Sequence, residues 1–216
     1  MYLPAHFNET RSEELRSLIS LHPLGALVVN GPEGLDANHL PFEYIAQPGG
    51  QDSLIAHVAR ANPVWKELSD GADALVIFRG EHAYVSPNWY PSTHETHQQV
   101  PTWNYRVVHV HGKIRIRDDE RFVRGVVARL TRTHEGRTGE ARPWKMTDST
   151  PEYIDRMLTA IVGIEIEITR MVGKWKISQN REDRDRVGAA QELQKRGETD
   201  LAEAMLGVKG KCDPDI

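Results

Sequence analysis

The chain is poor in cysteine and in long apolar runs, and both absences exclude whole classes of protein. Cys212 is the single cysteine among 216 residues, so no disulfide can form within the chain, which fits a reducing compartment. No apolar run approaches the roughly 18 residues of a membrane-spanning helix. The first residues also lack the basic and apolar regions of a secretory signal peptide. We therefore expect a cytoplasmic protein without a membrane partner.

An excess of positive charge is missing as well. Lysine and arginine number 27 against 31 aspartates and glutamates, which gives a net charge of −4 with histidine neutral. A protein that coats nucleic acid through bulk charge would be basic, so that class is excluded, although a local basic patch stays open. The 39% hydrophobic and 27% charged residues are typical of a soluble globular protein.

The familiar catalytic motifs are absent. We find no nucleophile elbow, no Ser-His-Asp order, no GxGxxG and no P-loop. Ten histidines are present, with the spacings His94-x-x-His97 and His109-x-His111. No cysteine cluster, HExxH or carboxylate-rich loop accompanies them, so we predict no metal site. A haem or iron site that uses one histidine remains a lesser alternative.

Hydrophobic periodicity predicts short strands in the centre of the chain and helices around them. We expect strands at 24–30, 35–44, 53–58, 74–78, 83–86, 103–116 and 164–168, with a hairpin turn at 79–81 and loops at 87–99 and 134–149. We expect helices from residue 12 to 21 and at 61–68, 118–132, 150–160, 183–195 and 199–205. This order favours a mainly β fold (α+β), an antiparallel barrel with peripheral helices, over alternating β-α units.

We expect residues 1–206 to form a single barrel domain that includes the C-terminal helices. Residues 207–216 read as a frayed tail. The two helices joined at Gly197 resemble a helix-turn-helix in outline. Their mixed charges, with Asp200 and Glu203 on the second helix, argue against a DNA-reading role.

The segment 174–181 holds the most informative cluster of the chain. It supplies three cations, an indole, a hydroxyl and two amides, from Lys174, Trp175, Lys176, Ser178, Gln179, Asn180 and Arg181. This inventory suits a planar, anionic, hydrogen-bonding ligand, of which flavin mononucleotide (FMN) is the simplest example. A solvated strand that buries its tryptophan and isoleucine explains the same pattern, and we keep that alternative open.

A second cluster of similar character occupies residues 101–105. In a strand, Thr102 and Asn104 share one face, while Trp103 and Tyr105 share the other. One face could then bind the edge of a ligand while the other fills a core or an interface. A polar edge strand with two packed aromatic side chains is the equally weighted alternative.

The turn that precedes Pro63 is the third candidate. Arg60 offers a bidentate donor fork, Asn62 adds an amide, and His57 lies on the strand before them. A helix beginning at Pro63 would place free N–H groups beside a bound phosphate. An ordinary strand-to-helix turn with a surface arginine is the alternative that the residues alone favour.

Several blocks of sequence together resemble the PaiB family, described as FMN-binding negative transcriptional regulators. They occur in order up to about residue 190, as MYLPxHF at 1–7, NHLPF at 38–42, HVARANP at 57–63, YVSPxWY at 84–90, VPTWNY at 100–105 and GKWKISQNR at 173–181. The resemblance implies an FMN-binding split β-barrel of the pyridoxine-phosphate oxidase and flavin-reductase type. Such proteins are commonly homodimers that hold the flavin at the subunit interface.

The resemblance also implies site residues. The segment entering the helix after the third strand contacts the flavin phosphate in the wider superfamily, which points here to His57, Arg60 and Asn62. A later strand contacts the ring, which points to Thr102, Trp103 and Asn104. A C-terminal segment reaches across from the partner subunit, and its matching residues are Lys174, Trp175, Lys176, Gln179 and Arg181.

The expected function is therefore negative transcriptional regulation by an FMN-binding homodimer, acting on DNA directly or through a partner. A flavin-dependent oxidoreductase acting on a small molecule needs the same ring and phosphate contacts, so whether the protein is an enzyme stays open. A haem-handling split barrel is the third and least favoured reading. The catalytic residues of an enzyme, if it is one, cannot be named from the sequence.

Overall fold

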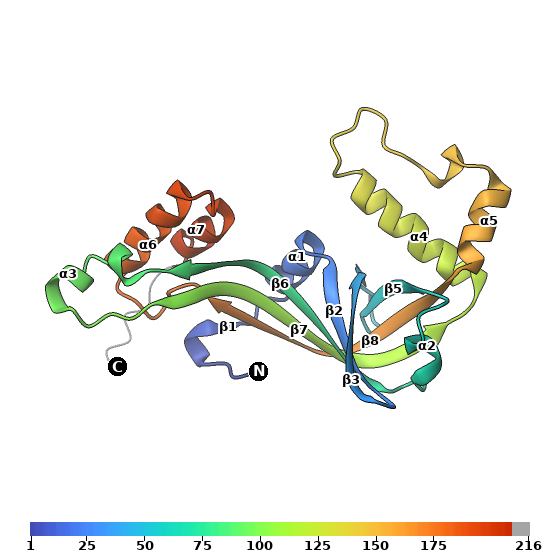
Figure 1. Cartoon of the computed structure of the whole chain (residues 1–216), viewed down its shortest axis with the longest axis horizontal. Coiled ribbons are helices and arrows are strands. Elements are labelled where there is room, and N and C mark those ends of the chain that lie inside the picture. The colour runs from blue at the N-terminus through green and yellow to red at the C-terminus, as the bar shows by residue number, and fades with distance from the viewer. Residues whose placement is uncertain (209–216) are drawn as a thin grey trace. The chain divides into compact units, whose positions relative to one another are not determined.

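The computed structural model of the protein describes residues 1–208 (Figure 1). Cys212 and most of the predicted tail at 207–216 lie outside the described residues. Among the helices of the described part, none is both long and apolar enough to cross a membrane.

Most strands and helices lie where the hydrophobic periodicity predicted them. The strands are β1 (Asn8–Glu9), β2 (Leu24–Gly31), β3 (Gly34–Pro41), β4 (Glu43–Ile45), β5 (Ser53–Ala59), β6 (Asp73–Val85), β7 (Thr102–Arg117) and β8 (Ile161–Lys176). The helices are α1 (Ser12–Leu21), α2 (Val64–Glu67), α3 (Thr93–Thr96), α4 (Glu120–Glu135), α5 (Pro151–Thr159), α6 (Asp183–Lys195) and α7 (Thr199–Leu206), with short 3₁₀ turns at Ala5–Phe7, Pro87–Trp89 and Met146–Asp148.

The strands form one sheet in the order β3-β2-β6-β7-β8-β5-β4, and β1 pairs with β8. The pairs of β2 with β3 and β6, and of β5 with β4 and β8, are antiparallel. Ala26 of β2 lies opposite Ile77 of β6, and Ala56 of β5 lies opposite Ile164 of β8. The predicted fold class, a mainly antiparallel β fold with peripheral helices, is confirmed.

The chain divides into two compact units. Unit 1 contains Met1–Leu15, Arg79–Val108 and the chain from Val172 on, and unit 2 contains Arg16–Phe78 and His109–Met171. The long strands β6, β7 and β8 each contribute residues to both units. We describe each unit by itself.

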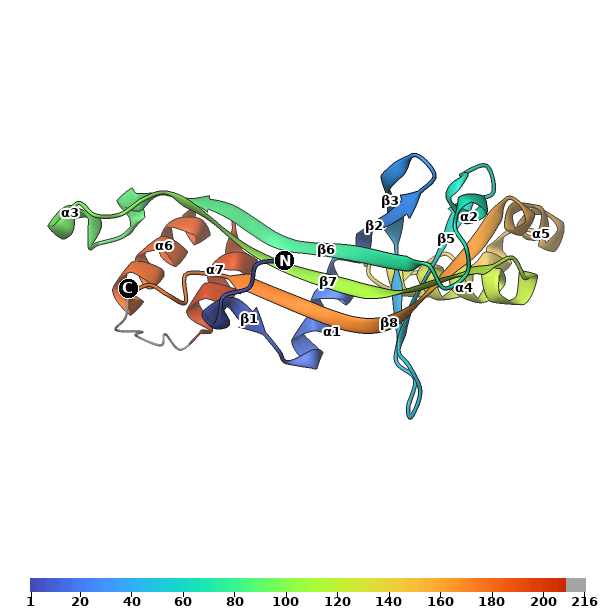
Figure 2. The same cartoon turned by 90° about the horizontal axis from the view of Figure 1, so that it is seen from below.

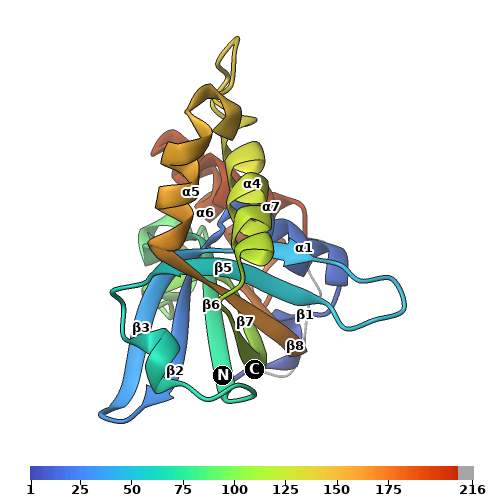
Figure 3. The same ribbon diagram turned by 90° about the vertical axis from the view of Figure 1, so that its right-hand side faces the viewer.

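In unit 2 the inward-facing side chains of the strands form an apolar core. Leu27, Leu54, Val76, Phe78 and Ile164 are all fully buried. Helices α4 and α5 run side by side, and α4 covers one face of β5 (Figure 3). This contact places Val126 and Leu130 of α4 against Ile55 of β5.

Gly112 of β7 marks a close approach between strands, as the sequence suggested. A Cβ atom at this position would lie 2.4 Å from the backbone oxygen of Glu167 on β8. Only glycine fits beside that carbonyl, because neither backbone can yield without breaking the ladder.

In unit 1 the helices α6 and α7 lie side by side (Figure 2). Asp185 at the start of α6 is 1% exposed, and its carboxylate accepts hydrogen bonds from the backbone N–H of Ser92 at 3.0 Å and from its hydroxyl at 2.6 Å. This buried pair fastens the segment that joins β6 to β7 onto α6. The segment was predicted as a loop, and within it Pro87–Trp89 and Thr93–Thr96 form short helical turns.

The predicted hairpin at 79–81 is wrong, because β6 runs unbroken from Asp73 to Val85. Arg79, Gly80 and Glu81 continue the alternation of the strand, and Glu81 forms an ion pair with Arg106 of β7. A hairpin loop of two or three residues needs a residue with positive φ, and Gly80 is not among the glycines that adopt one. The predicted strand at 35–44 is likewise divided into β3 and β4 at Phe42.

Candidate flavin site

Three cations gather where β8 ends in unit 1, and we call Lys174, Lys176 and Arg181 the cation cluster. The Lys174 ammonium donates to the Tyr2 carbonyl at 3.1 Å and lies over the ring of Tyr105 at 5.7 Å. The Arg181 guanidinium donates to Gln99 Oε1 at 2.7 Å. In the part of the chain that the structure describes, no carboxylate forms an ion pair with any of the three.

Lys176 stands at the centre of this cluster. Its ammonium donates to the hydroxyl of Thr102 and, at 2.7 Å, to the carbonyl of Trp103. Burial lowers the pKa of Lys176, and the neighbouring positive charges of Lys174 and Arg181 lower it further. A bound anion would offset this repulsion, because it would supply the counter-charge that the described residues do not.

An exposed aromatic surface lies on β6 and β7 of the same unit, and we call His82, Tyr84 and Trp103 the ring platform. Trp103 is 55% exposed. Its ring stacks on that of His82, with the ring centroids 6.3 Å apart. It packs against the Tyr84 ring in a T-shaped arrangement, with the centroids 6.1 Å apart. A large exposed indole suits the stacking of a planar aromatic ligand. The backbone carbonyl of the same residue accepts a hydrogen bond from Lys176 at 2.7 Å.

The site residues expected from the sequence include neither His82 nor Tyr84, although Tyr84 opens the block YVSPxWY at 84–90. Both belong to β6, which was divided by the hairpin expected at 79–81. Alternation along one continuous β6 would not have found them either. The buried positions change from even numbers up to Gly80 to odd numbers from Ala83 on, and this change leaves His82 and Tyr84 exposed.

Other residues of the predicted set are used inside the protein. Trp175 is 5% exposed, and the Arg106 guanidinium lies 6.0 Å from its ring. Asn104 is 1% exposed and donates to the Ser178 hydroxyl at 2.8 Å. These two side chains hold the scaffold of unit 1, since burial leaves them no open face for a ligand.

Gln179 closes the turn that follows β8. Its side-chain oxygen accepts the N–H of Ile177 at 2.8 Å, and its amide nitrogen donates to the Trp175 carbonyl. Ser178 within the turn has a φ of 66°, in the left-handed region. The strand β8 therefore ends at Lys176. The turn that follows places the Arg181 guanidinium 5.5 Å from the ring of Tyr90.

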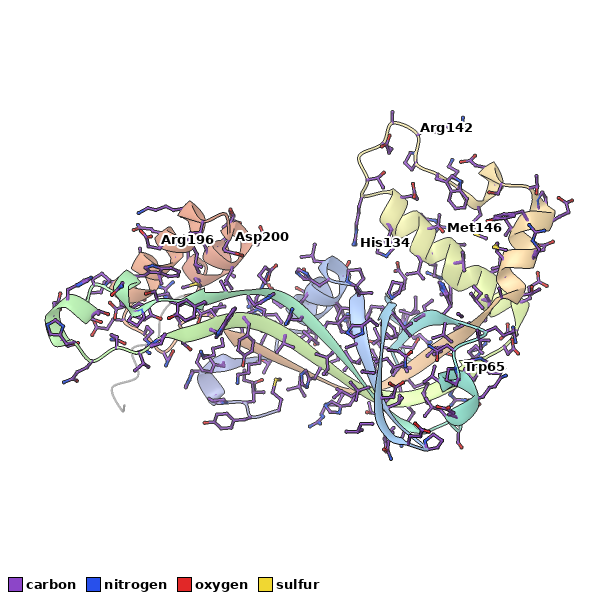
Figure 4. All side chains as sticks on the ribbon, in the orientation of Figure 1. Trp65, His134, Arg142, Met146, Arg196 and Asp200 are labelled. Carbon is purple, nitrogen blue, oxygen red and sulfur yellow. The ribbon has the colours of Figure 1, made fainter. Side chains whose placement is uncertain are left out.

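His57, Arg60 and Asn62 belong to unit 2. The Arg60 guanidinium is engaged by both oxygens of Asp118, at 3.0 and 2.6 Å, and by the Thr159 carbonyl at 2.7 Å. The hydrogen bonds from Arg60 lower the pKa of the Asp118 carboxyl. Trp65 of α2, labelled in Figure 4, donates its indole N–H to the Arg60 carbonyl at 3.0 Å.

Asn62 and His57 also have structural surroundings. The Asn62 amide donates to Asn38 of β3 at 2.7 Å, and its oxygen accepts the N–H of Val64 at 3.0 Å. The helix that follows, α2, spans only Val64–Glu67, so it offers little of the dipole expected for a phosphate. His57 is half-buried on β5, and burial lowers its pKa.

The structure thus brings Thr102, Trp103 and the cation cluster together in unit 1. It places His57, Arg60 and Asn62 in unit 2. Among residues 1–208 no group of three or more histidine, aspartate or glutamate side chains is arranged to hold a metal ion.

The fold and these clusters can now be set beside known proteins. A family model described as "Putative FMN-binding domain" matches residues 1–170, and the chain belongs to this family. The match covers most of the chain and confirms, at the level of the family, the expected cofactor FMN.

Individual relatives agree with the family. The chain is 29% identical over 194 residues to "Protease synthase and sporulation protein PAI 2" of Bacillus subtilis, which spans 90% of this chain and 89% of that protein. It is 31% identical to the uncharacterized protein AN0679 of Emericella nidulans, over 96% of each chain. The resemblance to the PaiB family is confirmed.

A solved structure supports the fold. The FAD and heme binding protein of Mycobacterium smegmatis superposes with a TM-score of 0.56 and 22% identity, covering 78% of this chain and 73% of that one. At this identity the likeness concerns the fold alone.

Proposed function

We propose that the protein binds FMN at the ring platform and cation cluster of unit 1 and acts as a negative transcriptional regulator. The observation that carries the proposal is the set of three cations without a carboxylate partner among the described residues. One of them, Lys176, donates to the backbone carbonyl of Trp103, whose side chain is exposed. FMN joins an aromatic ring system to a phosphate dianion, and these two surfaces complement its two parts.

Each side chain has a defined task in this proposal. Trp103 stacks on the ring system, while Lys176 and Arg181 neutralise the phosphate. Thr102 keeps the Lys176 ammonium in place through its hydroxyl. Trp175, Asn104 and Gln179 shape the strand and turn that carry these groups. When bound, flavin supplies one- or two-electron redox chemistry, and the protein supplies orientation and charge.

We further propose that a homodimer completes the site. The exposed aromatic side chains Tyr84 and Trp103 are typical of surfaces that become covered on association. In such a dimer, residues 174–181 reach a flavin shared with the partner subunit, as the family resemblance implies, and Lys176 and Arg181 neutralise its phosphate. The phosphate contacts that the resemblance implies for His57, Arg60 and Asn62 stay a prediction, because Arg60 is already paired with Asp118. Size-exclusion chromatography with light scattering would overturn this part if the protein were a monomer at micromolar concentration.

The regulatory role rests on the likeness to the sporulation protein PAI 2, which extends over most of both chains. Helices α6 and α7 do not present a reading helix, because α7 carries Asp200 and Glu203, so we propose that contact with DNA uses another surface or a partner protein. We place this activity in the cytoplasm. Direct contact requires DNA affinity that falls steeply as salt rises, and no binding at low salt would exclude it.

An absorbance titration tests the cofactor. The purified protein is mixed with FMN, dialysed, and recorded from 300 to 700 nm, where retained flavin bands are expected near ~375 and ~450 nm. Lys176→Met should lose the bands and Lys145→Met, which alters an exposed lysine of unit 2, should keep them. A wild-type protein that stays colourless would overturn the proposal, and rapid NADPH oxidation by the loaded protein would favour an oxidoreductase instead of a regulator.

A further inference from the structure

Unit 2 contains a cavity of about 380 Å³ between α4 and the strands β4, β5 and β8. Figure 3 shows α4 running across β5, which forms the wall opposite the helix. Ile45, Ile55, Phe122 and Val126 give the cavity an apolar side. Three features of its lining have no role in folding.

The first feature is a buried hydroxyl. Ser53 of β5 lines the cavity and is 1% exposed, and its Oγ atom has no hydrogen-bond partner among the described residues. A buried polar group without a partner costs free energy. A polar atom of a ligand in the cavity would satisfy it.

The second feature is a glycine in the middle of a helix. Gly125 lies in α4, faces the cavity and is exposed. Nothing lies within 4 Å of the place where a Cβ atom would be, so the fold would accept a side chain there. Because glycine destabilises a helix interior relative to alanine, its presence calls for a reason outside folding, and close approach of a ligand to the helix supplies one.

The third feature is a pair of free cations. Arg121 and Arg129 line the cavity one turn before and one turn after Gly125, and they lie on one face of the helix. Neither has an ion pair or a hydrogen bond through its side chain within residues 1–208.

The carboxylates of the cavity, in contrast, are already committed. Glu165 accepts a hydrogen bond from Arg117 at 2.5 Å. Asp119 caps α4 through the N–H of Phe122 at 2.8 Å and also faces Arg117 at 3.4 Å. The uncommitted charge at the cavity is therefore positive.

We infer that this cavity binds a small organic anion, with an apolar body against the Ile55 side and a carboxylate between Arg121 and Arg129. The Ser53 hydroxyl donates to a polar atom of the ligand, and Gly125 leaves room for its close approach. This site lies in unit 2 and does not depend on the flavin proposal for unit 1. It suits an effector that a regulator would sense.

Isothermal titration calorimetry with benzoate tests the inference, with benzamide as the uncharged isostere and inorganic phosphate as the anion without an apolar body. Benzoate is expected to bind saturably, and benzamide and phosphate more weakly by about tenfold or more, since each lacks one of the two recognition elements. Arg121→Gln and Arg129→Gln should each weaken benzoate binding by about tenfold. Arg132→Gln, the same change on the same helix outside this cavity, should leave it unchanged.

Gly125→Leu separates binding from folding. Leucine is a good helix former, so this variant should melt at the same temperature as the wild type or higher, yet it should lose benzoate binding because the side chain fills the cavity. No saturable benzoate binding to the wild type, or equal binding by Gly125→Leu, would overturn the inference. An altered molecular mass for Gly125→Leu would also overturn it and mark this face as a contact between copies of the chain.

Discussion

Arg60 of unit 2 and Lys176 of unit 1 carry the same charge, and both were predicted to bind the flavin. Arg60 is held by both oxygens of Asp118, whereas Lys176 meets a hydroxyl, a carbonyl and two further cations. A cation that already has its carboxylate gains little from a phosphate, because one partner must be exchanged for another. A cation without one gains the full pairing. The difference shows that a basic residue in the sequence indicates only a possible anion site. Whether the residue is free to bind an anion depends on the charges that the fold places around it.

The two tryptophans of the predicted site give the largest expected contrast. Trp175→Ala should lower the free energy of unfolding by about 3–5 kcal/mol, since it empties a buried position. Trp103→Ala should leave stability almost unchanged and weaken FMN binding by about 1–2 kcal/mol through lost stacking. Urea unfolding and FMN titration of both variants measure the two effects. Equal stability losses would show that Trp103 packs into a core or an interface instead of facing a ligand.

Removing the central cation tests the cluster itself. Lys176→Met keeps most of the apolar stem of the side chain and removes the ammonium, so FMN binding should weaken by about 2 kcal/mol, the scale of a hydrogen bond to a charged group. Fluorescence quenching of free FMN measures the change. An unaltered affinity would mean that the phosphate binds elsewhere.

A change at Asp118 tests whether its ion pair with Arg60 is what separates Arg60 from Lys176. Asp118→Asn removes the counter-charge of Arg60. If Arg60 contacts the phosphate, FMN should bind more tightly to this variant, and Arg60→Ala should weaken binding less than Lys176→Met does. The double variant Asp118→Asn/Arg60→Ala provides the control, because the loss of Asp118 should no longer raise FMN affinity when Arg60 is absent. No response of FMN affinity to either single change would assign Arg60 a purely structural role.

The smallest expected effect is the pH dependence of stability and of FMN binding that Lys176 causes. Burial and neighbouring cations hold the pKa of Lys176 below the ordinary lysine value. The unfolded chain therefore binds more protons than the folded one between the two pKa values, and this group makes stability rise with pH across that window. FMN binding should fall over the same window, because the ammonium is lost, and should be accompanied by proton uptake. Calorimetry in buffers of different ionisation enthalpy detects the uptake, which Lys176→Met should abolish.

The sequence predicted the fold well wherever one period dominated. Helices α4, α5, α6 and α7 and most strands follow from periodicity and from caps such as Asp119 and Thr150. It failed at 79–81, where a glycine between two charges imitated a turn, because cross-strand pairing of Glu81 with Arg106 is invisible along the chain. The length of β8 was also underestimated, since residues beyond 168 are held by strand pairing instead of by their own alternation.

The candidate site was predicted in part. The residue types at 102–105 and 174–181 indicated an aromatic anion, and the family match, which ends at residue 170, agrees with flavin. His82 and Tyr84 were missed, and alternation along an unbroken β6 would not have found them, because the exposed face of the strand changes from odd to even positions near residue 81. The burial of Trp175 and Ile177 matches the alternative kept open for residues 174–181. The burial of Asn104 was not foreseen, because a strand has two faces and the local pattern does not say which one is covered.

The sequence by itself determined the antiparallel β class, the order of the elements, the family and the presence of unusually concentrated cations near the C-terminal end. Only the tertiary structure decided which of those cations are already neutralised. Charge pairing joins residues such as Arg60 and Asp118 that lie far apart in the chain, and such pairs form only once the fold has brought their strands and helices together. The interaction of two charges depends on their distance and burial in space, and neither quantity is written in the order of residues.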